Sequence, residues 1–116
     1  MQVQLGQVMG ALAALGRVQR ERLAAPVAFR LARVVRAMQA EARAFQETRK
    51  ALVARYADEA GQVPAECRDE LGGELEALLA EEIELDLPRI TEAELASIEL
   101  TVEEALALAW MIGEDE

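Results

Sequence analysis

Apolar and polar residues alternate in two short segments of the chain. In residues 1–5, MQVQL, glutamines alternate with Val3 and Leu5, and in residues 82–87, EIELDL, acidic side chains alternate with aliphatic ones until Pro88. A two-residue period is typical of a half-buried strand, although residues 1–5 also suit the start of a helix. Because a lone strand leaves its backbone groups without partners, we expect these segments to pair in a small two-stranded sheet.

Between these two segments, apolar residues recur with the spacing of helices. From Gly6 to about Arg20 the apolar residues recur three or four positions apart, which predicts a short first helix. From about residue 26 to 58 they follow the heptad spacing of a packed helical seam, and Pro26 suits a first helical turn. The seam consists of Ala28, Leu31, Val35, Met38, Ala42, Phe45, Arg49, Leu52 and Tyr56.

The predicted long helix exceeds the expected diameter of the domain. It would span roughly 50 Å at a rise of about 1.5 Å per residue, whereas a compact domain of this length is only about 35 Å across. One end should therefore protrude, and its apolar seam needs a covering helix. The covering helix is either the third helix of the same chain or part of another subunit. Both arrangements would bury the same residues of the seam, so the spacing alone does not distinguish them.

A loop and a third helix follow the long one. Gly61 and Pro64 mark the loop, and the leucines of residues 67–81 form one apolar helical face, even though Gly72 and Gly73 lie within it. We expect the second and third helices to form an antiparallel hairpin.

Two threonine–glutamate pairs mark two short helices near the carboxyl end. Thr91 with Glu94, and Thr101 with Glu104, each match a capping box, in which the threonine oxygen accepts a bond from an early helical N–H and the glutamate reaches back. The last helix, over residues 102–112, has a broad apolar face, and the acidic end of the chain is expected to reach into solvent. That face contains Val102, Ala105, Leu106, Ala109 and Trp110.

These elements predict a mainly helical α+β fold: a long antiparallel helical hairpin with short N- and C-terminal helices and a minimal two-stranded β-sheet. The chain has 116 residues, of which 53% are apolar. This length and composition suit a single domain, residues 1–116, with enough aliphatic side chains for a core.

Charge divides the chain into two unlike halves. Residues 1–56 hold ten basic and three acidic side chains, a balance of +7, whereas residues 57–116 hold two basic and nineteen acidic ones, a balance of −17. One interpretation is that the acidic half folds back on the basic helix and the surplus negative charge keeps the protein soluble. The other is that the acidic surface meets a basic partner. The net charge of −10 argues against direct nucleic-acid binding.

Composition also narrows the possible chemistry. The chain has no histidine, and Cys67 is its only cysteine, so histidine-based catalysis and cysteine or histidine metal sites are excluded. No phosphate-binding glycine loop or nucleophile motif is present. We therefore expect no enzymatic activity, cofactor or metal.

The segment from Met1 to Gly16 is too short and polar to span a bilayer, and we expect a cytoplasmic protein without a membrane partner.

A basic stripe on the long helix is the first candidate binding surface. Arg36, Arg43 and Lys50 are spaced by seven and share one face, with Arg33 adjoining. They suit an anionic ligand or an acidic protein, or else form a solvated flank that pairs with glutamates of the neighbouring helix.

Two further candidate surfaces lie in the acidic half. Glu82, Glu84 and Asp86 share one strand face, which is either a solvated acidic face or a docking surface for a basic partner; parallel side chains do not converge on a metal. Leu106 and Trp110 either cap the chain's own core or anchor a partner protein.

Two segments of the chain carry a resemblance to a known group of proteins. AFQETRKALVARY, residues 44–56, and LLAEEIELDLPRI, residues 78–90, resemble the long helix and following strand of small tailed-bacteriophage and prophage proteins of unknown function. The likeness spans most of the chain and transfers no functional residue. It implies a phage-encoded protein acting in the host cytoplasm or in the virion.

These observations favour a non-enzymatic phage accessory protein that binds another protein, either as a host-factor inhibitor or adaptor or as a virion-assembly component. One alternative is an oligomeric small-ligand or nucleotide sponge, in which Arg33, Arg36, Arg43 and Lys50 face a symmetry mate. Another is a purely structural subunit that forms a homo-oligomer through the long helix.

Overall fold

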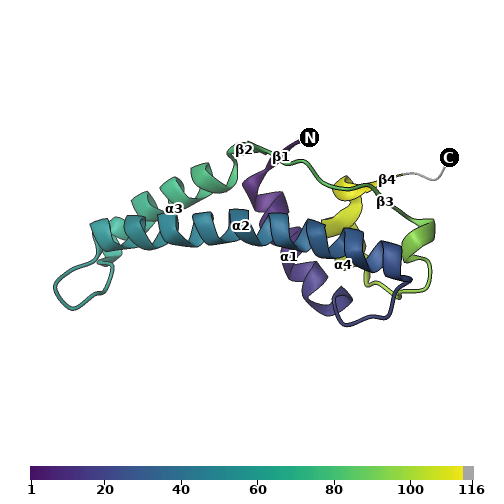
Figure 1. Ribbon diagram of the computed structural model, residues 1–116. Coiled ribbons are helices and arrows are strands. Elements are labelled where there is room, and N and C mark those ends of the chain that lie inside the picture. The colour runs from purple at the N-terminus through teal and green to yellow at the C-terminus, as the bar shows by residue number, and fades with distance from the viewer. Residues whose placement is uncertain (114–116) are drawn as a thin grey trace.

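A computed structural model describes residues 1–113; the acidic residues 114–116, expected to reach into solvent, lie outside the described residues. The molecule measures 54 × 26 × 24 Å and has a radius of gyration of 17.0 Å, compared with about 13 Å for a compact domain of this length. The excess comes from the helical hairpin, which extends away from the other elements (Figure 1). The predicted protrusion of the long helix is therefore confirmed.

The predicted two-stranded sheet is present. Strand β1 (Gln2–Gln4) pairs antiparallel with β2 (Glu82–Glu84), and Val3 lies opposite Ile83. Helix α1 (Leu5–Val18) begins at Leu5, the last residue of the predicted strand. The sheet thus holds the amino end of the chain against the segment that follows the hairpin.

Three helices form most of the molecule. Helix α1 (Leu5–Val18) packs against α2 (Ala25–Tyr56), and α3 (Ala65–Leu79) runs back along the far half of α2 as the second arm of the predicted hairpin (Figure 1). In the loop between α2 and α3, Oδ1 of Asp58 accepts backbone hydrogen bonds, and Gly61 has a φ of 80°, a conformation that favours glycine.

The seam of α2 is covered within the single chain. Leu31, Val35 and Met38 are buried in the main core, and Phe45 is buried in the hairpin half. The main core also takes residues from α1 and from the carboxyl-terminal region, including Val8, Leu15, Ile90 and Leu108. These apolar side chains of the seam already pack inside one molecule. A homo-oligomer through the long helix stays a prediction.

The carboxyl-terminal region differs in part from the sequence prediction. Residues 93–95 form only a 3-10 turn, η1 (Ala93–Leu95), in place of the first short helix. Leu95 and Ile98 are both buried, and a spacing of three suits the tighter turn, which has about three residues per turn.

The last helix is confirmed but shorter than predicted. It is α4 (Val102–Leu108), and it continues as a 3-10 turn, η2 (Ala109–Met111). Strands β3 (Ile90–Thr91) and β4 (Ile112–Gly113) form a second, parallel pair that no sequence pattern indicated. This pair brings the end of the described chain beside η1.

Candidate functional site

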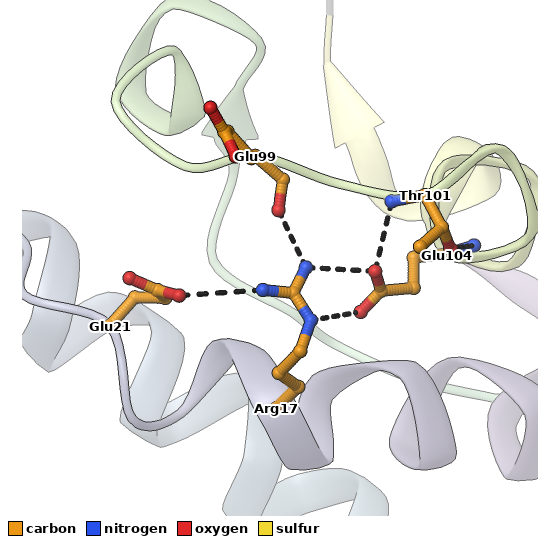
Figure 2. A network of polar contacts seen from close by, with 5 residues as sticks. All are labelled: Arg17, Glu21, Glu99, Thr101 and Glu104. Atoms are coloured by element: carbon orange, nitrogen blue, oxygen red, sulfur yellow. Dashed lines mark hydrogen bonds and ion pairs between the residues drawn. The ribbon is translucent and has the colours of Figure 1, made fainter.

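Arg17, at the end of α1, contacts α4, the loop before α4 and the loop that follows α1 (Figure 2). Its Nε and Nη2 donate to the carboxylate of Glu104 at 2.9 and 2.8 Å, and Nη2 also donates to the backbone oxygen of Glu99 at 2.5 Å. A third contact, from Nη1 to Glu21, measures 3.4 Å. A bidentate arginine–carboxylate pair fixes both distance and orientation, so Arg17 sets the position of α4 relative to α1.

Glu104 is also the capping residue of its own helix. The backbone N–H of Thr101 donates to Glu104 Oε1 at 2.9 Å, and the backbone N–H of Glu104 donates to Thr101 Oγ1 at 3.1 Å, which confirms the predicted capping box. One carboxylate therefore holds both the start of α4 and the guanidinium of Arg17.

The same arrangement occurs a second time in the molecule. Arg30 of α2 pairs with the Glu94 carboxylate and donates from Nη1 to the backbone oxygen of Arg89 at 2.8 Å. Glu94 accepts from the backbone N–H of Thr91 at 3.1 Å, and its own N–H donates to the Thr91 hydroxyl at 3.3 Å. The basic half thus neutralises the two capping glutamates of the acidic half, as the fold-back interpretation expects.

These contacts favour the charged carboxylates. Hydrogen bonds from Arg17 and from the Thr101 backbone lower the pKa of Glu104 from 4.5 to about 2, and Arg30 lowers the pKa of Glu94 in the same direction. A carboxylate with a depressed folded-state pKa stabilises the fold above its unfolded-state pKa, and this contribution is lost as the pH falls through the folded-state value.

The Arg17→Gln variant is expected to lose a pH-dependent part of its stability. Near neutral pH its free energy of unfolding should lie below that of the wild type, and the gap should close as the pH falls from 4.5 toward 2, where Glu104 becomes protonated. Urea denaturation across this range measures the gap. Arg22→Gln, which removes the same charge from an exposed side chain, is the control. A gap that is independent of pH would contradict the role given to the pair.

Helix α4 presents apolar side chains on two opposite faces. Leu108 on α4 and Met111 just beyond it are buried in the core, whereas Val102 and Leu106 are 76% and 72% exposed. The predicted apolar face is therefore the outward one, because the Arg17 contact turns the Glu104 side of the helix toward α1. A helix that is apolar on both sides has buried only half of its apolar surface.

The outward face of α4 borders a groove of about 490 Å³. Its lining is apolar except for Glu92, which precedes η1, and is formed by η1, the loop before α4, α4 itself, η2 and β4. The lining residues are Glu92, Leu95, Leu100, Val102, Ala105, Leu106, Leu108, Ala109 and Ile112. We call this feature the α4 groove.

Negative charge surrounds the α4 groove. Glu92 lines it, and Glu99 and Glu103 are exposed and adjacent in sequence to lining residues. The sequence has no lysine or arginine after Arg89, and Arg17 and Arg30 are already engaged with other carboxylates. The groove therefore combines an apolar floor with an acidic rim.

The predicted basic stripe lies on the outward face of α2. Arg33, Arg36, Arg43 and Lys50 are all exposed, and within residues 1–113 none of the four forms an ion pair with a neighbouring helix. Arg36 lines a pocket of about 320 Å³ together with Glu21. The four cations point outward along a single helix, so one molecule does not bring them together around an anion.

The predicted acidic strand face is exposed at Glu82, Glu84 and Asp86. Glu84 pairs with the Met1 ammonium group at 2.6 Å. In the described part of the chain, no group of three or more acidic or cysteine side chains is placed to hold a metal ion.

Leu106 and Trp110, predicted as a pair, have different environments. Leu106 is exposed, whereas Trp110 is half-buried against the core. The indole Nε1 of Trp110 is buried, and no partner for it lies among residues 1–113. The structure thus places Leu106 in the α4 groove and Trp110 at the edge of the core.

Sequence analysis missed the arginine pairs and most of the groove lining. One sequence signal could have indicated the groove. Helix α4 contains more apolar residues than one buried face of a helix can hold. Val102 and Leu106 are spaced by four and mark the second face.

No family model, curated protein or solved structure matches this chain. None of its described helices is both long enough and apolar enough to cross a membrane.

Proposed function

We propose that this protein is a non-enzymatic binding protein that docks on another protein through the α4 groove. The observation that carries the proposal is the exposure of Val102 and Leu106, at 76% and 72%, beside an apolar groove of about 490 Å³. Exposed apolar patches with a polar rim are typical of interaction sites, and covering one aliphatic side chain contributes about 1.5–3 kcal/mol.

The charge around the groove defines the kind of partner. An acidic rim repels phosphate groups and anionic lipid headgroups, so nucleic acids and most membrane surfaces are poor partners. A protein segment that combines an apolar anchor with lysine or arginine side chains fits both the floor and the rim.

The resemblance to phage proteins supports a partner from the host cell or from the phage particle. In this proposal the protein acts in the host cytoplasm or during virion assembly, as an inhibitor, an adaptor or an assembly component. The competing role of nucleotide sponge needs a second copy to complete each anion site, because Arg33, Arg36, Arg43 and Lys50 point outward from one helix face.

The Leu106→Asp variant tests the proposal directly. A buried charge replaces the central apolar anchor, so we expect the variant to retain at most about a tenth of the partner that wild-type protein captures, since loss of an interface anchor costs about 2 kcal/mol or more. Tagged protein is exposed to nuclease-treated host lysate and to phage particles, and the retained proteins are quantified by mass spectrometry.

The matched control is Ala54→Asp, which adds the same charge at an exposed position of α2 far along the hairpin. It should retain partner at the wild-type level. Equal retention by Leu106→Asp and wild type would contradict a docking role for the groove. So would a wild-type protein that retains no specific protein and also does not associate with itself.

A further inference from the structure

The outward face of α2 carries an exposed apolar side chain that the core does not use. Phe29 is 69% exposed. It lies nine residues before Met38, which is fully buried, and nine residues make about two and a half turns, so the two side chains point in opposite directions. The ring of Phe29 therefore faces solvent in the single molecule and is accessible to a partner.

Basic residues follow Phe29 at helical spacing. Arg33 and Arg36 come four and seven positions later, on the same side of α2, and both are exposed. Together Phe29, Arg33 and Arg36 present an exposed apolar side chain flanked by positive charge, which we call the Phe29 ridge.

The Phe29 ridge and the α4 groove are complementary in charge, and both offer exposed apolar side chains. The ridge offers one large apolar side chain with two cations, and the groove offers an apolar floor of about 490 Å³ with Glu92, Glu99 and Glu103 around it. Both belong to the same chain, and Phe29, Val102 and Leu106 are among its most exposed large apolar side chains.

We propose that the occupant of the α4 groove is the Phe29 ridge of a second copy of this chain. The inference rests on the proposed function, in which the groove is a protein-docking site, and it identifies the partner. Charge complementarity between the basic amino-terminal half and the acidic carboxyl-terminal half favours this pairing over the pairing of two grooves, which would bring like charges together.

The contact is heterologous. Each copy presents one ridge and one groove from different elements, α2 and α4, so a dimer still has one free ridge and one free groove. Such head-to-tail contacts produce rings when the rotation closes and filaments when it does not. One helical ridge in one groove buries less than the approximately 1,200 Å² of a standard interface, so dilution should dissociate the assembly.

A mixing experiment tests this geometry. Phe29→Asp damages the ridge and leaves the groove, whereas Leu106→Asp damages the groove and leaves the ridge; both residues are exposed, so neither change disturbs the core. In sedimentation velocity over a concentration series, wild-type protein should form oligomers and each variant alone should remain monomeric. An equimolar mixture of the two variants should form dimers and stop there, because the remaining ridge and groove are the damaged ones.

Ala54→Asp should assemble as the wild type does, and Arg33→Glu with Arg36→Glu should weaken assembly at least about tenfold in dissociation constant. A monomeric wild type, or unchanged assembly of Phe29→Asp, or a mixture without dimers, would overturn the inference. If wild-type protein is monomeric and Leu106→Asp still loses a captured partner, the proposed function stands and the occupant is a different protein with a basic segment.

Discussion

The Met38→Ala variant is expected to lose about 2–5 kcal/mol of its free energy of unfolding. Met38 is fully buried and is among the largest side chains of the core cluster, which joins α2 to α1 and to the carboxyl-terminal elements. Truncation removes the transfer free energy of three heavy atoms and leaves a cavity that the close-packed neighbours fill only in part. A loss of this size is a large share of the roughly 5–15 kcal/mol that stabilise a typical domain.

Urea denaturation followed by circular dichroism measures this loss. Gln39→Ala, at the exposed neighbouring position of the same helix, is the control and should change stability by no more than about 0.5 kcal/mol. If both variants unfold at the same urea concentration, Met38 does not pack as the structure shows.

The Leu71→Ala variant is expected to open the hairpin while the core stays folded. Leu71 is the buried residue of α3, and neither it nor Phe45 of α2 belongs to the main core cluster. The far half of the hairpin therefore rests on few buried contacts, and such regions open locally at a lower free energy than the whole domain. Truncating Leu71 should lower the free energy of this local opening by about 2–5 kcal/mol.

Amide hydrogen exchange under native conditions distinguishes the local opening from global unfolding. Exchange in α3 should accelerate by about thirtyfold or more, as the lower figure of 2 kcal/mol implies, while the amides of α1 stay protected. Glu76→Ala, an exposed change on the same helix, should leave both rates unchanged. Equal acceleration in α1 and α3 would show that the hairpin and the core unfold as one unit.

Much of the fold was predictable because it depends on local periodicity. The alternation in residues 1–5 and 82–87 predicted the β1–β2 pair, and the heptad spacing predicted α2 and its protrusion. The 3-10 turn at η1 was not predictable, because the preference for a tighter turn arises only where Leu95 and Ile98 meet the core together.

The candidate site was predicted only in outline. Both capping boxes were visible as threonine–glutamate pairs, but Arg17 and Arg30 lie 87 and 64 residues from the glutamates that they bind, and no local pattern connects them. Sequence analysis names Leu106 either as a cap on the core or as an anchor for a partner, yet the groove beside it is assembled from separate segments between η1 and β4.

The sequence by itself determined the helices, the first strand pair, the capping boxes and the division of charge, because each depends on the spacing or identity of neighbouring residues. Only the tertiary structure decided which face of α4 is buried, which cations remain unpaired and where an apolar groove opens. These features depend on how distant segments pack. A helix with apolar residues on two sides, such as α4, could bury either face, and its apolar pattern does not say which. In the structure Leu108 is buried and Arg17 binds Glu104, and in this orientation of α4 Val102 and Leu106 are exposed.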